Sequence, residues 1–190
     1  MNNIIIREAT LADAEQIARV HVQAWQETYK DMIAEKDLNS ITYKYRLEFR
    51  KKYLSKHDDE TIHLVAVNNQ GEIIGFCDAG PIRDGTPVRG EIYTIYILDK
   101  YKGMGIGKAF WNRAVDHLVN HELTPYIAWT LAANTIAIKF YEKHAGSVGT
   151  TKMTNMGECG DSDICKKYGE ICYIFDKPVL GELLSNEPLN

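Results

Sequence analysis

The stretch Gly103-Met104-Gly105-Ile106-Gly107 has the composition of a turn that binds phosphate. Residues 92–97, just before it, are all β-branched or aromatic, which favours a strand. Apolar residues then recur every four positions and predict a helix, namely Ile106, Phe110, Ala114 and Leu118. Glycines let a backbone approach a ligand closely, and the first N–H groups of a helix have no partner within it. The pattern therefore predicts a phosphate site at residues 103–108.

Spacing separates three kinds of phosphate-binding turn. A P-loop requires G-x-x-x-x-G-K-[ST], but the fifth residue after Gly103 is Lys108. A dinucleotide fingerprint requires G-x-G-x-x-G, which fails for the same residue. The segment instead resembles the pyrophosphate loop of the GNAT superfamily of acyl-CoA N-acyltransferases, whose pattern is [RQ]-x-x-G-x-[GA]. Gly105 and Gly107 match it, and Lys102 replaces the usual Arg or Gln, although lysine also binds phosphate as a point charge.

A second segment is similar to the same family. Residues 134–143 read N-T-I-A-I-K-F-Y-E-K and match the family's N-x-x-A-x-x-F-Y-x-K. The resemblance implies that Asn134 contacts the pantetheine arm, that Ala137 lets the cofactor pass close to the helix, and that Tyr141 protonates the departing thiolate. A phenol with a pKa near ~10 carries a proton at neutral pH and can give it to a thiolate of pKa ~8.5. The structural alternatives are a helix cap for Asn134 and a core aromatic for Tyr141.

The resemblance implies acetyl-CoA as the co-substrate and names the residues that contact it. In the family the strand before the turn splays from the next strand, and the pantetheine amides pair with the opened edge, since unpaired edge groups accept such an addition. The expected cofactor-binding residues are, on the strand, Ile95, Tyr96 and Ile97; in the turn, Lys102, Gly103, Met104, Gly105, Ile106, Gly107 and Lys108; and on the later helix, Asn134, Ala137 and Tyr141.

Glu91 is the candidate general base, because some family members carry a catalytic glutamate on this part of the strand. Strict alternation would place Glu91, Tyr93, Ile95 and Ile97 on one face of the strand. A carboxylate beside Tyr93 would be partly desolvated, which raises a carboxyl pKa toward the range useful for a base. A strand-edge carboxylate without a catalytic role is the alternative, and Asp78 on the preceding strand is the rival base.

The segment Trp25-Gln26-Glu27-Thr28-Tyr29 resembles the W-x-E-T-Y segment of one branch of the superfamily, in which the first two helices cover the acceptor site. The resemblance implies that Trp25, Glu27 and Tyr29 bind the substrate. An aromatic face near a carboxylate would suit a cationic amine. Core packing of Trp25 and Tyr29 is the alternative.

The hydrophobic pattern predicts an α/β fold with a mixed sheet, helices on both faces and the element order β-α-α-β-β-β-α-β-α-β-β, as in the GNAT fold. Strands are expected at residues 4–6, 61–67, 72–79, 92–97, 126–131, 147–153 and 169–175, and helices at 14–29, 35–56, 106–118 and 135–144. The helix at 35–56 has a basic face, which is typical of a solvated surface. Residues 1–176 form the predicted acetyltransferase domain and 177–190 a C-terminal tail.

Composition limits the remaining function classes. The chain has 190 residues, 45% of them hydrophobic, and a net charge of −4, which argues against nucleic-acid binding. No apolar run reaches the ~20 residues of a membrane span, and the N-terminus lacks the features of a signal peptide, so we expect a cytoplasmic protein without membrane contact. The four cysteines form no C-x-x-C and lack zinc-site spacing, so we expect reduced thiols and no metal.

These observations together predict an N-acetyltransferase that moves an acetyl group from acetyl-CoA to a primary amine by direct attack. The expected acceptor is a small-molecule amine or a peptide amine. Two alternatives stay open, a non-catalytic acyl-CoA sensor and a transferase that uses a longer acyl-CoA. The sequence leaves the acceptor unnamed and a homodimer open.

Overall fold

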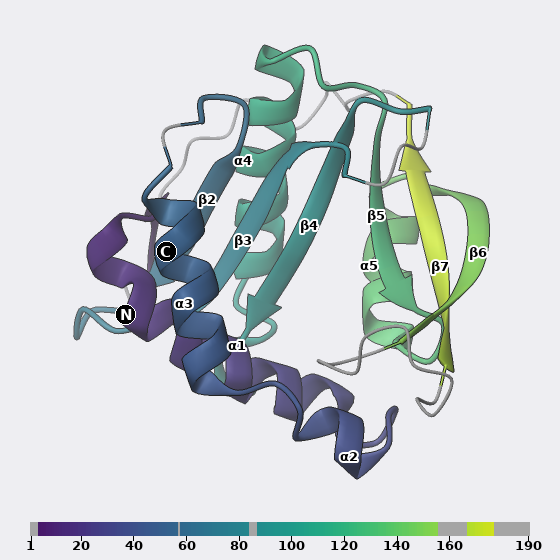
Figure 1. The fold of residues 1–190 in the computed structure, drawn as a ribbon. Coiled ribbons are helices and arrows are strands. Elements are labelled where there is room, and N and C mark those ends of the chain that lie inside the picture. The colour runs from purple at the N-terminus through teal and green to yellow at the C-terminus, as the bar shows by residue number, and fades with distance from the viewer. Residues whose placement is uncertain (1–3, 57, 84–86, 156–166, 177–190) are drawn as a thin grey trace.

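A computed structural model of the chain describes residues 4–56, 58–83, 87–155 and 167–176 (Figure 1). Its elements, in chain order, are β1 (Ile5–Glu8), the 3-10 helix η1 (Leu11–Asp13), α1 (Ala14–Tyr29), α2 (Glu35–Leu38), α3 (Tyr43–Leu54), β2 (Ile62–Val67), β3 (Ile73–Pro81), β4 (Gly90–Ile97), the 3-10 helix η2 (Asp99–Tyr101), α4 (Ile106–Asn120), β5 (Tyr126–Leu131), α5 (Thr135–Lys143), β6 (Ser147–Asn155) and β7 (Lys167–Phe175). The predicted tail at 177–190 lies outside the described residues.

The strands form one mixed sheet in the order β1-β2-β3-β4-β5-β7-β6. Every neighbouring pair is antiparallel except β4 and β5, which run parallel. Alternate residues of β2 point to opposite faces, so Val65 packs with Ile17 of α1 while Leu64 packs with Phe110 of α4. The helices α1 and α3 cover one face, and α4 and α5 cover the other (Figure 1). The predicted fold class is confirmed.

The parallel strands β4 and β5 separate partway along their length. They pair from Gly90–Tyr126 to Ile92–Ala128, and no register pair follows Ile92. Figure 1 shows the two strands diverging toward their C-terminal ends. This divergence, which the family resemblance led us to expect, leaves residues 94–97 of β4 paired with β3 alone.

The expected single helix at 35–56 is wrong, because α2 ends at Leu38 and α3 begins at Tyr43. The backbone N–H of Tyr45 donates to Thr42 Oγ1 at 3.3 Å, so Thr42 caps a new helix. Ile41, in the connection, is 3% exposed and packs in the cluster around Trp25. The apolar residues at helical spacing therefore belong to two separate helices and to the buried segment that connects them.

The described residues bear on three expectations, which concern membrane spans, metal sites and the state of the cysteines. No helix among them is both long and apolar enough to cross a membrane. Nor do they bring three or more His, Cys, Asp or Glu side chains into a group that could hold a metal ion. Cys77 and Cys172 are buried free thiols, while Cys159 and Cys165 lie outside the described residues.

Candidate active site

The glycine turn lies between η2 and α4, at the end where β4 has separated from β5. Gly103 has φ +80° and Gly105 has φ +81°, a left-handed conformation that favours glycine. A Cβ added to Gly103 would meet nothing within 4 Å, so the turn is open to an incoming ligand. Gly105 is the N-cap of α4, and the first N–H groups of that helix, which have no partner within the helix, follow directly. Lys102 Nζ lies 2.5 Å from Asp99 Oδ1, so its charge is already paired.

The free edge of β4 leads from this turn into the sheet. Ile95, Tyr96 and Ile97 pair on one side with β3, and their other side lies beyond the last β5 partner. Across the split, Asn134 is the N-cap of α5, and its Oδ1 accepts the N–H of Ala137 at 3.1 Å. The capping alternative for Asn134 is therefore present in the structure. It uses the side-chain oxygen and leaves the amide nitrogen as the donor that a ligand could meet.

Tyr141 lies on the α4–α5 face of the sheet and is 8% exposed. Its ring packs among aromatic side chains, with Trp111 at 5.9 Å and Tyr173 at 5.5 Å between ring centroids. Burial raises the pKa of the Tyr141 phenol well above its ordinary value, and the neighbouring Tyr29 raises it further. The hydroxyl therefore keeps its proton at neutral pH, which is the form that a proton donor requires.

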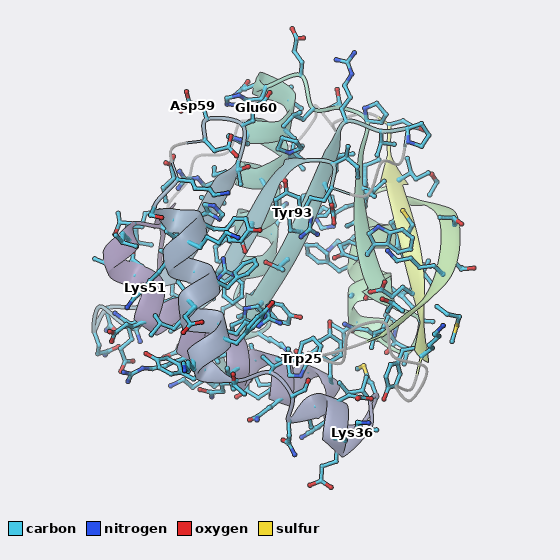
Figure 2. The ribbon with its side chains drawn as sticks, in the orientation of Figure 1. Trp25, Lys36, Lys51, Asp59, Glu60 and Tyr93 are labelled. Carbon is cyan, nitrogen blue, oxygen red and sulfur yellow. The ribbon has the colours of Figure 1, made fainter. Side chains whose placement is uncertain are left out.

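A cavity of about 410 Å³ occupies the split on the face covered by α1. Its lining comes from four strands, from the loop between β3 and β4 and from α1, with Tyr93 lying on β4 near the middle of Figure 2. Eight of the ten lining residues are aromatic or charged, namely Tyr29, Arg83, Glu91, Tyr93, Tyr96, Trp129, Lys152 and Glu170. The exceptions are Thr130 and Leu131. Rings beside carboxylates suit a cationic molecule.

Glu91 lines this cavity from β4. Its carboxylate accepts two hydrogen bonds from Arg83, from Nη2 at 2.5 Å and from Nε at 3.0 Å. The Arg83 guanidinium also lies 4.1 Å from the centroid of the Tyr93 ring, and the Tyr93 hydroxyl donates to the carbonyl of Pro81 at 2.6 Å. Glu91 is thus buried, held in a fixed orientation, and open to the cavity.

The expected single face of β4 is wrong because a β-bulge interrupts the strand. Ile92 pairs with Ala79 and Thr94 with Asp78, so Tyr93 is an extra residue between two successive pairs. Beyond the bulge the alternation reverses. Ile95 and Ile97 then pack against the α4 side, whereas Tyr96 faces the cavity with Glu91. Alternation in sequence could not reveal this reversal, because the bulge exists only relative to β3.

Asp78, the rival base, lies outside the cavity lining and is enclosed by donors. Arg50 Nη1 donates to both carboxylate oxygens at 2.8 and 2.9 Å, Thr94 Oγ1 donates at 2.9 Å, and His63 Nδ1 lies 2.7 Å away. Burial would raise the pKa of Asp78, but the nearby Arg50 charge and these contacts hold it far below its usual range. The expectation of a solvated basic face on the second helix is wrong for Arg50, which is buried.

The three residues expected to bind the acceptor have different surroundings, and only Tyr29 is part of the cavity lining. Trp25 is buried at the C-terminal half of α1, and its Nε1 donates to the carbonyl of Leu38 at 3.1 Å (Figure 2). Glu27 accepts the backbone N–H of Asp99 at 2.8 Å and thereby holds η2, away from the cavity lining. Tyr29 does line the cavity, with its hydroxyl 3.5 Å from that of Tyr96, and burial raises its pKa.

Sequence reasoning missed all four charged or aromatic lining residues outside α1 and β4, namely Arg83, Trp129, Lys152 and Glu170. Arg83 precedes β4 in a loop, and the other three lie on β5, β6 and β7. Lys152 pairs in register with Glu170, and Leu131 pairs with Glu170 from the other side. These neighbours are brought together by strand register, for which the sequence carries no motif. Lys152 and Glu170, the charged residues inside the last two strands, were the one available signal.

Comparisons with known proteins agree on one family. The model described as the Acetyltransferase (GNAT) family matches residues 21–146. YuaI of Bacillus subtilis (strain 168), described as an uncharacterized N-acetyltransferase, is 34% identical over 143 residues, which cover 75% of this chain and 79% of YuaI.

Solved structures share the fold at lower identity. The PaiA N-acetyltransferase from Thermoplasma acidophilum, in complex with coenzyme A, has a TM-score of 0.67 and 21% identity, covering 88% of this chain and 97% of its own. NAA60 of Arabidopsis thaliana, in complex with a bisubstrate analogue, has a TM-score of 0.65 and 17% identity, covering 90% and 97% respectively. At these identities the likeness concerns the fold.

Proposed function

The chain belongs to the acetyltransferase (GNAT) family and is an acyltransferase, and on this premise we propose that it moves an acetyl group from acetyl-CoA to a primary amine by direct attack. One observation carries the proposal: the split between β4 and β5 connects an open glycine turn at a helix N-terminus with a cavity that contains a buried carboxylate. A co-substrate with a diphosphate at one end and a reactive thioester at the other fits this path.

Residues on the path suit acetyl-CoA in three places. The left-handed Gly103 and Gly105 leave space beside the first turn of α4, where N–H groups would bind the diphosphate. The free edge of β4 at residues 95–97 offers backbone groups to the pantetheine amides. Asn134 would donate to the same arm from the start of α5. Bound there, acetyl-CoA supplies an activated acetyl group at the split.

Glu91 would accept the proton that the acceptor ammonium must lose before it attacks. An alkyl ammonium with a pKa near ~10 is mostly charged at pH 7, so a nearby carboxylate, acting directly or through a water molecule, helps the reaction. Glu91 is favoured over Asp78 because it borders the cavity, whereas Asp78 already has Arg50, His63 and Thr94 around it. Tyr141 would give its proton to the thiolate that leaves.

The relatives support the two substrates. The PaiA structure contains coenzyme A, and the NAA60 structure contains a bisubstrate analogue, a molecule that combines features of both substrates. Simultaneous occupancy of both subsites is what direct attack requires, since the amine must meet the thioester while both are bound.

Two measurements test the proposal. The first follows thiol release from acetyl-CoA with a panel of alkylamines, amino acids and peptides, with mass spectrometry of the products. Acetylated amine is the expected result. Binding of acetyl-CoA without transfer to any amine would instead favour the sensor, and faster transfer from a longer acyl-CoA would favour the other alternative.

The second measurement tests the turn by calorimetric titration with CoA. Gly103→Glu places a negative side chain at the expected diphosphate position and should weaken CoA binding about tenfold or more. Gly71→Glu is the matched control, because Gly71 has φ +78° and a Cβ there also meets nothing within 4 Å, but it lies in the β2–β3 turn. Equal CoA affinity in the two variants would show that the turn was assigned wrongly.

A further inference from the structure

Two cation–carboxylate pairs border the cavity, and they are held differently. Arg83 contacts both oxygens of Glu91, at 2.5 and 3.0 Å. Lys152 Nζ lies 3.7 Å from Glu170 Oε2, well beyond the ~2.7–2.9 Å of a charge-assisted hydrogen bond. The Lys152 side chain is also 43% exposed, whereas that of Glu170 is 17% exposed. Lys152 is therefore the more exposed and loosely held member of a pair whose carboxylate is mostly buried in the cavity wall.

The Lys152 ammonium has a second contact, the face of Trp129. Nζ lies 3.7 Å from the centroid of that ring, within the ~6 Å range of a cation–π interaction. The ammonium lies over the face of the indole, and, among the described residues, the buried Trp129 Nε1 has no hydrogen-bond partner. Trp129 and Glu170 lie on β5 and β7, which pair along their length, so the spacing of ring and carboxylate is set by the sheet.

We propose that Trp129 and Glu170 form the subsite that binds the ammonium group of the acceptor, and that Lys152 fills this subsite until the acceptor displaces it. The inference rests on the proposed function for the identity of the cavity as the acceptor site. Glu91 lines the same cavity from β4, so the bound ammonium and the proposed proton acceptor would lie in the same cavity.

The present occupant defines the chemical class of the acceptor. The end of a lysine side chain is an n-butylammonium, so the subsite accepts a protonated primary amine on an unbranched alkyl chain. Free alkylamines and lysine side chains of peptides share this chemistry. Burial raises the pKa of Glu170, and the positive charge of Lys152 opposes that rise. The ammonium of a bound acceptor would stabilise the charged Glu170 carboxylate in the same way.

Lys152 must also weaken the binding of any competing amine. A group tethered beside its site has an effective concentration in the millimolar range, so a free amine has to outcompete it. Removing the Lys152 side chain should therefore lower the apparent Kd for a small alkylammonium about tenfold or more. Removing the Glu170 charge should abolish that gain, because the ring alone would remain.

The test is a titration of the full chain with n-butylammonium chloride, followed by the indole N–H signal of Trp129 in NMR spectra. Trp129→Phe assigns the signal among the three tryptophans of the chain. Lys152→Ala is expected to bind the probe at least tenfold more tightly than the unmodified chain. Lys51→Ala, an exposed lysine on α3 (Figure 2), is the control and should behave as the unmodified chain does. n-Butanol, which has the shape without the charge, should leave the signal unchanged.

Two results would overturn the subsite. One is a Trp129 signal that responds to the probe no more strongly in Lys152→Ala than in the unmodified chain. The other is undiminished binding in Lys152→Ala/Glu170→Gln. Because this readout needs no catalysis, it separates the subsite from the proposed function: expected binding without acetylation of any amine would refute the transferase and leave the subsite standing.

A transfer assay with acetyl-CoA then distinguishes the two sources of the amine. n-Butylamine and the lysine side chain of Nα-acetyl-lysine amide are compared as acceptors for the unmodified chain and for Lys152→Ala. A lower KM in Lys152→Ala for either acceptor supports displacement of Lys152, and the acceptor with the greater kcat/KM identifies the source. An unchanged KM for both would contradict displacement.

Discussion

Asp78 and Glu91 are both buried carboxylates paired with an arginine, yet they occupy different surroundings. Their side chains are 9% and 6% exposed. The partners differ sharply, since the Arg50 side chain is 2% exposed and that of Arg83 is 57% exposed. Asp78 also has His63 and Thr94 against it, while Glu91 faces a cavity. Burial alone therefore does not distinguish the two candidate bases, whereas access from the cavity does.

Asp78 and Glu91 differ in how their surroundings offset the free-energy cost of removing a carboxylate from water. A buried ion pair is stable only when its remaining lone pairs are satisfied, which Asp78 achieves with donors from β2, β4 and α3. A carboxylate surrounded in this way cannot meet a substrate proton. Glu91 gains its fixed orientation from one arginine and keeps its cavity side open. We therefore interpret Asp78 as a structural centre that joins α3 to the sheet, and Glu91 as the reactive group.

The largest expected effect is on stability, from Asp78→Asn. Removing the charge leaves Arg50 buried without its partner, and breaking such a pair typically costs about 3–5 kcal/mol. Urea unfolding at pH 7 measures the loss. Glu91→Gln is the control and should cost about 1 kcal/mol or less, because Arg83 can turn to solvent. Equal losses in the two variants would remove the distinction between the pairs.

For catalytic activity we expect the opposite order, with the larger loss in Glu91→Gln. Glu91→Gln keeps the shape and removes the base, so kcat/KM should fall about 10²–10³-fold at pH 7 with any amine that is acetylated. The loss should diminish as pH rises, because more of the acceptor is then already neutral. The affinity for CoA should stay the same, since the role concerns the acceptor. An unaltered pH–rate profile would place the base elsewhere.

A third variant tests the proton donor on the other face of the sheet. Tyr141→Phe keeps the ring and should lower kcat about 10²-fold if its hydroxyl protonates the thiolate. Tyr126→Phe is a matched control, because both rings pack against Trp111 and Phe175 and burial raises the pKa of both phenols. Similar kcat values for the two variants would contradict the role of Tyr141.

Local patterns predicted much of this molecule. The turn at 103–107 and the helix from Thr135 follow from short segments whose glycines, cap and apolar spacing act within a few residues. The turn between β2 and β3 at residues 68–71 is also stabilised within a few residues, with Gly71 at φ +78° and its N–H donating to the carbonyl of Asn68. The confirmed fold class depended on the order of such elements and on the family resemblance.

Features that depend on partners distant in sequence could not be predicted in the same way. The bulge at Tyr93 is defined by β3, and the burial of Arg50 by Asp78 on a different element. The wall formed by Trp129, Lys152 and Glu170 requires the register of three strands. The roles of Glu91 and Tyr141 stay predictions, since geometry shows their positions and only kinetics shows their function.

The smallest expected effect concerns the acid side of the stability profile. The surroundings of Asp78 lower its folded-state pKa, so its contribution is complete above the unfolded value near ~3.9 and is lost as pH falls toward the folded value. Between pH 5 and pH 3 the unmodified chain should lose about 1 kcal/mol through this group, at ~1.4 kcal/mol per pH unit below the unfolded pKa. Asp78→Asn lacks the group, so the stability gap between the two chains should narrow by that amount in urea unfolding at pH 3. A gap that stays constant from pH 5 to pH 3 would mean that the Arg50–Asp78 pair is not held in its charged form, and the contrast with Glu91 would then need another explanation.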